Sequence, residues 1–271
     1  MEAKFEKHIR LRGSLTALDC LSEETDLSRQ QLKHVMQNGA VWLESARGIS
    51  RLRRAKKVLT EGDQLHLYYD AEIQKKQPPE AELIADEGDY SIWNKPSGMY
   101  SQGTKWGDHF TIYRWAEQHL SPQRTAFIVH RLDRAANGLI LVAHKKSVAA
   151  MFSKMFEQRE IYKKYHATVE GLIADIEVPH EIDNELDGKR SISEIVSIAR
   201  NGAENTTDVE VVIKTGRKHQ IRRHLSGLGY PIVGDRLYGS PNTAQDLQLS
   251  AVHMRFICPV SGNEKSYCLG N

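Results

Sequence analysis

Two consecutive prolines interrupt the chain within a polar stretch, Gln74–Glu80, and they constrain its fold more than any other feature of the 271 residues. Proline lacks a backbone N–H and fixes φ, so neither a helix nor a central strand continues through such a pair. We therefore predict a linker over residues 74–82. It separates a small N-terminal domain, residues 1–73, from a larger C-terminal domain, residues 83–271.

The N-terminal domain is expected to contain a helix followed by two strands. Ser28–Gln31 has the pattern of a capping box, and apolar residues then recur at helical spacing up to an Asn-Gly pair. Strands are expected at 40–43 and 65–69, with a basic loop between them. No acid interrupts this loop between residues 47 and 57, a pattern typical of phosphate contacts, although a solvated loop is the alternative. The basic residues are Arg47, Arg51, Arg53, Arg54, Lys56 and Lys57.

The C-terminal domain mixes strands and helices without a regular βαβ alternation, which predicts an α+β fold. Strands are expected at 127–129, 139–143, 165–169, 209–213 and 254–257, and a helix over 147–160.

Several familiar kinds of site are absent from the sequence. It has no Walker loop, no GxGxxG motif, no HExxH motif and no GxSxG elbow. Its three cysteines include no CxxC pair, so neither a disulfide framework nor a cysteine-rich zinc site is expected. No apolar run is longer than Leu139–Ala143, which is far shorter than the roughly 20 residues of a membrane span. The chain starts with no signal-peptide pattern, so it is expected to be cytoplasmic. No bound metal is expected either, because the sequence shows no metal-ligand motif.

The net charge of +2 conceals a strong segregation of charge along the chain. Residues 127–168 and residues 213–271 each carry eight basic and three acidic side chains, whereas residues 169–212 carry three basic and eleven acidic ones. The two basic blocks could fold onto one face and present a surface for a polyanion. A surface of mixed sign is the alternative.

Three segments of the C-terminal domain could carry chemistry. The segment His130–Arg134 places an aspartate between two arginines, which favour its ionised form. Such a carboxylate can act as a nucleophile or a base, although a structural ion pair is the commoner role. Thr215–Leu225 gathers basic residues around the expected start of a helix, and Tyr230–Gly239 is a loop punctuated by glycine.

Taken together, these three segments resemble the RluA family of pseudouridine synthases, and the likeness runs from about residue 83 to the C-terminus. Asn94–Gly98 and Tyr162–Gly171 match two further patterns of that family. The resemblance implies a mixed, mainly antiparallel sheet and an enzyme that isomerises uridine in structured RNA without a cofactor. We expect ribosomal RNA rather than transfer RNA as the substrate, although the sequence itself does not distinguish the two. We expect a monomer with RNA as its partner and no membrane association.

The resemblance also implies a role for individual residues. Asp133 matches the catalytic aspartate, Tyr165 the tyrosine that stacks on the target base, and Arg222 the arginine that pairs with the aspartate. Ile221 matches an apolar residue beneath the base, and Arg131 an arginine that enters the RNA stack. The remaining expected substrate contacts are His130, Arg217, His219 and Gln220.

The sequence departs from the family pattern at three places. Ala136-Asn137 stands where the family has two hydroxyl side chains, Tyr100–Gly103 replaces a Val-His-Pro stretch, and Ser250 replaces a histidine. These departures leave open a non-catalytic RNA-binding or ribosome-assembly factor on the same fold. A metal-dependent nuclease is not expected, because no carboxylate cluster accompanies Asp133. The N-terminal domain, with its helix, its Asn-Gly turn and its Gly62-Asp63 turn, resembles the small S-four-type RNA-binding domain.

Overall fold

The computed structural model describes residues 3–270, which form two compact units. The first unit contains the chain up to Pro79 together with Gln102–Trp115, and the second contains Glu80–Ser101 and the chain from Ala116 onward. Residues 102–115 therefore lie in the first unit, although the predicted boundaries assigned them to the C-terminal domain. No helix among residues 3–270 is both long and apolar enough to cross a membrane.

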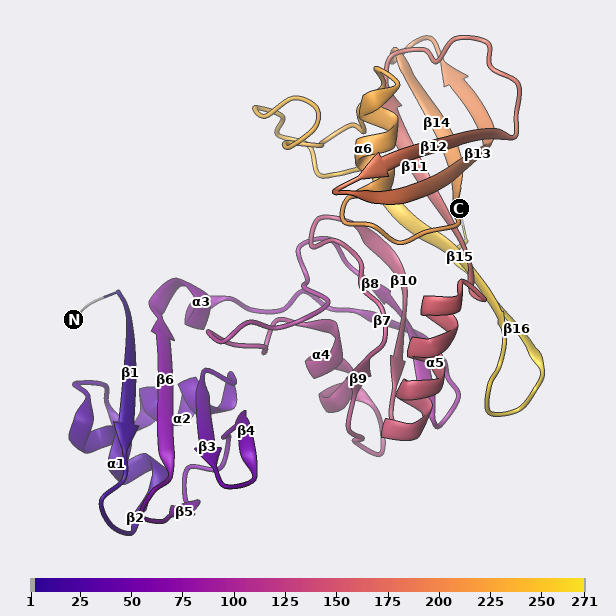
Figure 1. Ribbon diagram of the computed structural model, residues 1–271. Helices are drawn as coiled ribbons and strands as arrows, with labels where there is room; N and C mark the ends of the chain where they lie inside the picture. Colours follow the sequence, from indigo (N-terminus) through magenta and orange to yellow (C-terminus); the bar gives the residue numbers. More distant parts are fainter. Residues whose placement is uncertain (1–2, 271) are drawn as a thin grey trace. The chain divides into compact units, whose positions relative to one another are not determined.

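The first unit is a four-stranded antiparallel sheet with α1 and α2 packed on one face (Figure 1). The strands follow the order β1 (Lys4–Arg10), β6 (Gln64–Asp70), β3 (Val41–Ser45) and β4 (Gly48–Arg51). The helices are α1 (Ala17–Glu24), α2 (Arg29–Gln37) and α3 (Ala71–Lys75), and β2 (Leu15–Thr16) pairs with β5 (Val58–Leu59). Leu21, Leu32, Leu65 and Leu67 are fully buried where the helices meet the sheet.

The capping box predicted at the start of α2 is confirmed. The backbone N–H of Gln31 donates to the Ser28 hydroxyl at 3.2 Å, and that of Ser28 donates to the Gln31 side chain at 2.9 Å. The prediction of one continuous basic loop is wrong at β4. Gly48 adopts a φ of 102°, which closes a tight turn and returns the chain against β3.

The polar stretch around the two prolines is less uniform than the sequence indicates. Gln74 and Lys75 end α3, and the next strand begins at Glu82. The side chain of Gln74 is buried and its polar groups are satisfied. It accepts a hydrogen bond from Asn38 at 2.9 Å and donates one to the carbonyl of Trp106 at 3.2 Å. The chain from Lys76 to Ala81 has no helix or strand.

The second unit is built on a ten-stranded sheet (Figure 1). Its order is β12 (His180–Leu186), β13 (Lys189–Asn201), β14 (Thr206–Ile213), β11 (Tyr162–Glu170), β15 (Leu249–Ile257), β10 (Asn137–Ala143), β8 (Tyr90–Lys95) and β7 (Glu82–Asp86), with β16 (Glu264–Cys268) beside β15 and β9 (Phe127–Ile128) beside β10. Among the strands of residues 3–270 that pair here, only β10 and β15 run parallel. The expected α+β fold with a mainly antiparallel sheet is confirmed.

Two helices cover parts of this sheet. The helix α5 (Lys146–Gln158) packs Val148 and Phe152 onto β10 and β8, close to the predicted range of 147–160. The helix α6 (Gln220–Gly227) lies against β12 and β13 (Figure 1), and α4 (Ile112–His119) precedes β9 in the chain. The five predicted strands fall on β9, β10, β11, β14 and β15.

Gly138 fixes how closely β10 approaches β15. It pairs in parallel with Ala251 and has a φ of 113°. A Cβ atom at this position would lie 2.4 Å from both the backbone nitrogen and the backbone oxygen of Ala251. Only glycine fits, and the position matters because β10 directly follows the Asp133 segment.

We expect Gly138→Ala to lower the free energy of unfolding by about 3 kcal/mol, because it combines a left-handed backbone with a clash against backbone atoms. Chemical denaturation monitored by circular dichroism measures this change. Gly202→Ala is the matched control, since no atom lies within 4 Å of its Cβ position, and it should cost less than about 1 kcal/mol. Equal stabilities of the two variants would contradict the packing argument.

Candidate active site

A cavity of about 620 Å³ opens in the second unit, between the segment before β10, β11 and the start of α6. All nine residues that the sequence predicted as catalytic or substrate-binding line it. They are His130, Arg131, Asp133, Tyr165, Arg217, His219, Gln220, Ile221 and Arg222. Seven Lys and Arg side chains line the cavity, against the two carboxylates of Asp133 and Glu157. The cavity is therefore suited to a polyanionic ligand.

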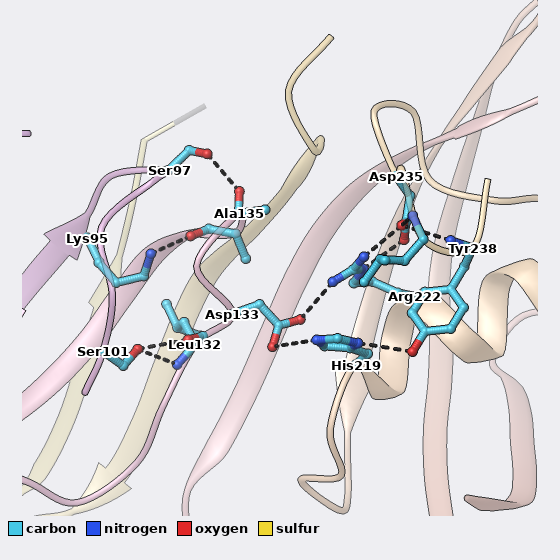
Figure 2. A network of polar contacts seen from close by, with 12 residues as sticks. Lys95, Ser97, Ser101, Leu132, Asp133, Ala135, His219, Arg222, Asp235 and Tyr238 are labelled. Carbon is cyan, nitrogen blue, oxygen red and sulfur yellow. Dashed lines mark hydrogen bonds and ion pairs between the residues drawn. The ribbon is translucent and has the colours of Figure 1, made fainter. Parts of the chain in front are cut away.

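Asp133 lies in a loop that side chains from the end of β8 and the turn after it hold from one side (Figure 2). The hydroxyl of Ser101 donates to the carbonyl of Leu132 at 2.8 Å and accepts from its N–H at 3.0 Å. The hydroxyl of Ser97 donates to the carbonyl of Ala135 at 2.8 Å. In the sequence, Ser101 is only part of a departure from the family pattern. In the structure, its hydroxyl holds Leu132, the residue next to Asp133.

Lys95 completes this support from a fully buried position. Its ammonium donates to the carbonyls of Pro96, Met99 and Ala136 at 2.9, 3.0 and 2.6 Å. Burial lowers the pKa of Lys95 to about 7, although the charge of Asp133 opposes the shift. The sequence placed Lys95 in a family pattern without giving it a role, because its three acceptors are known only from the fold.

On the opposite side of Asp133 lies Arg222, which is 5% exposed. Arg222 forms a bidentate salt bridge with Asp235, in which Nε and one terminal nitrogen each lie 2.7 Å from a carboxylate oxygen. Its other terminal nitrogen reaches Asp133 at 3.5 Å (Figure 2). Arg222 is thus held by one aspartate and directed at the other.

Asp235 is itself almost fully buried. Burial opposes its ionisation, but hydrogen bonds from Arg222 and from the N–H groups of Leu237 and Tyr238 lower its pKa. The residue is therefore a carboxylate that orients Arg222. In the sequence, Asp235 lies within a glycine-punctuated loop that predicts no role for it.

His219 approaches the other oxygen of Asp133, with Nε2 at 3.7 Å (Figure 2). Its Nδ1 lies 3.0 Å from the hydroxyl of Tyr238, and its backbone has a φ of 54°, in the left-handed region. Burial lowers the pKa of His219, and the charge of Asp133 opposes this shift. The ring is fixed between Asp133 and Tyr238.

Tyr165 and Ile221 form the buried wall of the cavity, at 8% and 5% exposure. Burial and the charge of Asp133 raise the pKa of Tyr165, so its side chain remains a phenol. Arg131 is exposed at the same cavity, where it can meet a ligand first.

Two other predicted substrate contacts, Gln220 and His130, form interactions within the protein itself. The side chain of Gln220 bonds to Thr215, to the N–H of Arg217 and to β13. His130 stacks on Phe156 with ring centres 4.3 Å apart. Its Nε2 accepts a hydrogen bond from the N–H of Leu141 at 2.9 Å. Burial and the charge of Lys163 lower the pKa of His130 to about 3, so the ring is neutral.

The six basic residues of the first unit divide into two groups. Arg51 and Arg53 contact the buried carboxylate of Asp108 at 3.1 and 2.5 Å. Their charges are therefore compensated within the unit. The other four are exposed: Arg47, Arg54, Lys56 and Lys57.

Comparison with known proteins identifies the family. Residues 89–227 match the RNA pseudouridylate synthase family. The chain belongs to this family. The dual-specificity RNA pseudouridine synthase RluA of Vibrio cholerae is 32% identical over 206 residues, which cover 70% of this chain and 82% of that protein. The tRNA pseudouridine synthase C of Yersinia pestis is 30% identical over 212 residues, covering 67% and 82%.

The fold agrees with this assignment. The solved structure of human RNA pseudouridylate synthase domain containing 1 superposes with a TM-score of 0.59 at 22% identity and covers 72% of this chain and 86% of that one. The chain is thus a pseudouridine synthase of the RluA type, an isomerase. The resemblance predicted from its motifs is confirmed.

In a synthase of this build, Ser101→Ala should lower kcat by about tenfold, because the loop that carries Asp133 loses two hydrogen bonds and the carboxylate shifts. The free energy of unfolding should fall by about 1 to 2 kcal/mol. The rate of pseudouridine formation at saturating RNA measures kcat, and chemical denaturation measures the free energy of unfolding. Ser97→Ala, which removes one bond farther from Asp133, should have the smaller effect on kcat, and the reverse order would contradict the argument.

Proposed function

We propose that Asp133 is the catalytic carboxylate with which this synthase isomerises uridine in structured RNA. The position of its carboxylate carries the proposal. The side chain is 21% exposed and lines the basic cavity, with Arg222 3.5 Å from one oxygen and His219 3.7 Å from the other. Both distances are long for hydrogen bonds, so the carboxylate is oriented and still accessible to a ligand.

The reaction breaks the bond between ribose and nitrogen 1 of uracil, turns the ring and rejoins it to the same ribose carbon through carbon 5. Nitrogen 1 gains the proton that carbon 5 loses, so the exchange needs neither a redox cofactor nor an energy source. An ionised Asp133 serves as the nucleophile at the ribose carbon or as the base that removes a ribose proton. Arg222 orients this carboxylate in either route.

Tyr165 and Ile221 are the proposed contacts of the base. A flat aromatic ring on the cavity wall offers a face for the uracil, and the apolar side chain packs beneath it. Because its pKa is raised, Tyr165 offers a phenol hydroxyl that can exchange a proton near carbon 5. Arg131 is the proposed side chain that fills the space from which the uridine leaves.

The uridine must leave its helix before it reaches this cavity, and loops allow this at the lowest cost. We propose ribosomal RNA as the first substrate to test, since a large folded RNA offers phosphates both to the cavity and to the four exposed cations of the first unit. Transfer RNA is the second, because relatives include a dual-specificity enzyme and a tRNA enzyme. One chain supplies all the proposed catalytic residues, so we propose a monomer.

Pseudouridine mapping by carbodiimide modification tests the proposal. Ribosomal and transfer RNA from cells lacking the gene are compared with RNA from cells rescued by the wild type or by Asp133→Asn. We expect one or a few sites to disappear without the gene and to return only with the wild type, because the amide can neither attack nor accept the proton.

The rescue variants separate the outcomes. Sites restored by Asp133→Asn would contradict the role of Asp133. Maps that are identical with and without the gene would contradict isomerisation of these RNAs, and would favour an RNA-binding assembly factor on the same fold. Salt-sensitive RNA binding by purified Asp133→Asn shows that the variant is folded.

A further inference from the structure

Lys163 is a cation of the cavity that has no counterion among residues 3–270. Lys163 lines the cavity from β11, and its ammonium makes no hydrogen bond or ion pair within residues 3–270. Its ammonium lies 5.3 Å from the ring centre of Phe156. The next residue differs, since Lys164 is outside the cavity lining and binds Glu210 at 2.6 Å. Two adjacent lysines of one strand thus have different surroundings.

The surroundings of Lys163 disfavour an isolated charge. Burial lowers its pKa to about 8, which still leaves it largely protonated at neutral pH. Its neighbours Phe156 and the neutral ring of His130 offer no negative charge. Of the two carboxylates that line the cavity, Asp133 faces Arg222 and His219, and Glu157 forms no ion pair within the described chain. A half-buried cation without a counterion is destabilising unless a ligand supplies one.

Arg159 is a second unpaired cation of the same cavity. Arg159 follows the last turn of α5 and lines the same cavity, and its side chain has no hydrogen bond or ion pair among residues 3–270. Its backbone has a φ of 64°, a left-handed conformation that costs energy for a residue other than glycine. The end of α5 and the start of β11 therefore each present one unpaired cation to the cavity.

We propose that Lys163, together with Arg159, forms a phosphate subsite that holds a backbone phosphate of the RNA next to the extruded uridine. The inference rests on the proposed function, because it takes the cavity to receive an RNA nucleotide. Lys163 and Tyr165 are two residues apart on β11, about 7 Å along the strand. A single nucleotide can therefore contact the tyrosine with its base and the lysine with its phosphate.

Binding of oligouridylate to the full chain tests the subsite without requiring catalysis. Lys163→Met should weaken binding about tenfold and reduce the slope of log affinity against log salt by about 0.7, the value for one phosphate contact with a single strand. Lys164→Met should leave both quantities unchanged, because its charge is paired outside the cavity. Lys163→Arg should restore most of the affinity, since it returns the charge.

Thermal unfolding distinguishes this role from a structural one. Methionine has a similar volume and removes an unpaired buried charge, so the Tm of Lys163→Met should equal or exceed that of the wild type. Equal salt slopes for Lys163→Met and Lys164→Met would overturn the proposal, as would a Tm loss that accounts for the weaker binding.

The subsite and the proposed function can fail separately. On RNA mapped as a substrate, Lys163→Met should raise KM more than it lowers kcat, because a phosphate contact is made in the ground state as well. A wild type that isomerises no uridine would refute the proposed function, while a difference in salt slope between the two methionine variants would still support the subsite.

Discussion

The ion pair between Arg222 and Asp235 is the interaction on which the rest of the site depends. Both side chains are almost completely buried, and each carries a charge that the protein interior tolerates only when it is paired. Asp235 is fixed by two backbone N–H groups, and Arg222 is fixed in turn by Asp235. The remaining nitrogen of Arg222 is then directed at Asp133 without a further ordering cost.

Asp133 is held from two directions that are far apart in the sequence. The end of β8 and the turn after it fix the loop that carries Asp133, through Lys95, Ser97 and Ser101. At the start of α6, Arg222 and His219 set the electrostatic field at the Asp133 carboxylate. Neither side is a direct neighbour of Asp133 in the chain, and the close approach of β10 to β15 at Gly138 brings them together. The geometry of the carboxylate is therefore set before a ligand arrives.

The sequence predicted the residues that meet in the cavity better than the residues that hold them there. Asp133, Tyr165 and Arg222 stand in motifs whose spacing matches a family, and the structure places all three around one cavity. The motifs that contain Asp235 and Lys95 predicted no role for either residue. Arg222 lies 13 residues from Asp235 and Ala136 lies 41 residues from Lys95, and such distant partners leave no local pattern. Ser101 departs from the family pattern in the sequence, yet its hydroxyl binds Leu132.

The fold shows the same contrast. Strands with an unbroken apolar run, such as β10, were predicted, whereas β12 and β13 were not, because His180–Leu186 and Lys189–Asn201 are rich in charged side chains and lie partly exposed. The basic run around Arg51 and Arg53 was interpreted as one phosphate-binding loop. Two of its charges instead pair with Asp108, which lies more than fifty residues further along the chain.

The single-turnover rate of pseudouridine formation by Arg222→Lys tests the central claim most directly. A lysine can keep one bond to Asp235, but it lacks the planar fork that engages both aspartates at once. Arg223→Lys is the matched control, because Arg223 pairs with the exposed Asp187 instead. We predict a rate about a hundredfold below that of the wild type for Arg222→Lys, with the fold retained, and an unchanged rate for Arg223→Lys. A wild-type rate in Arg222→Lys would contradict the account.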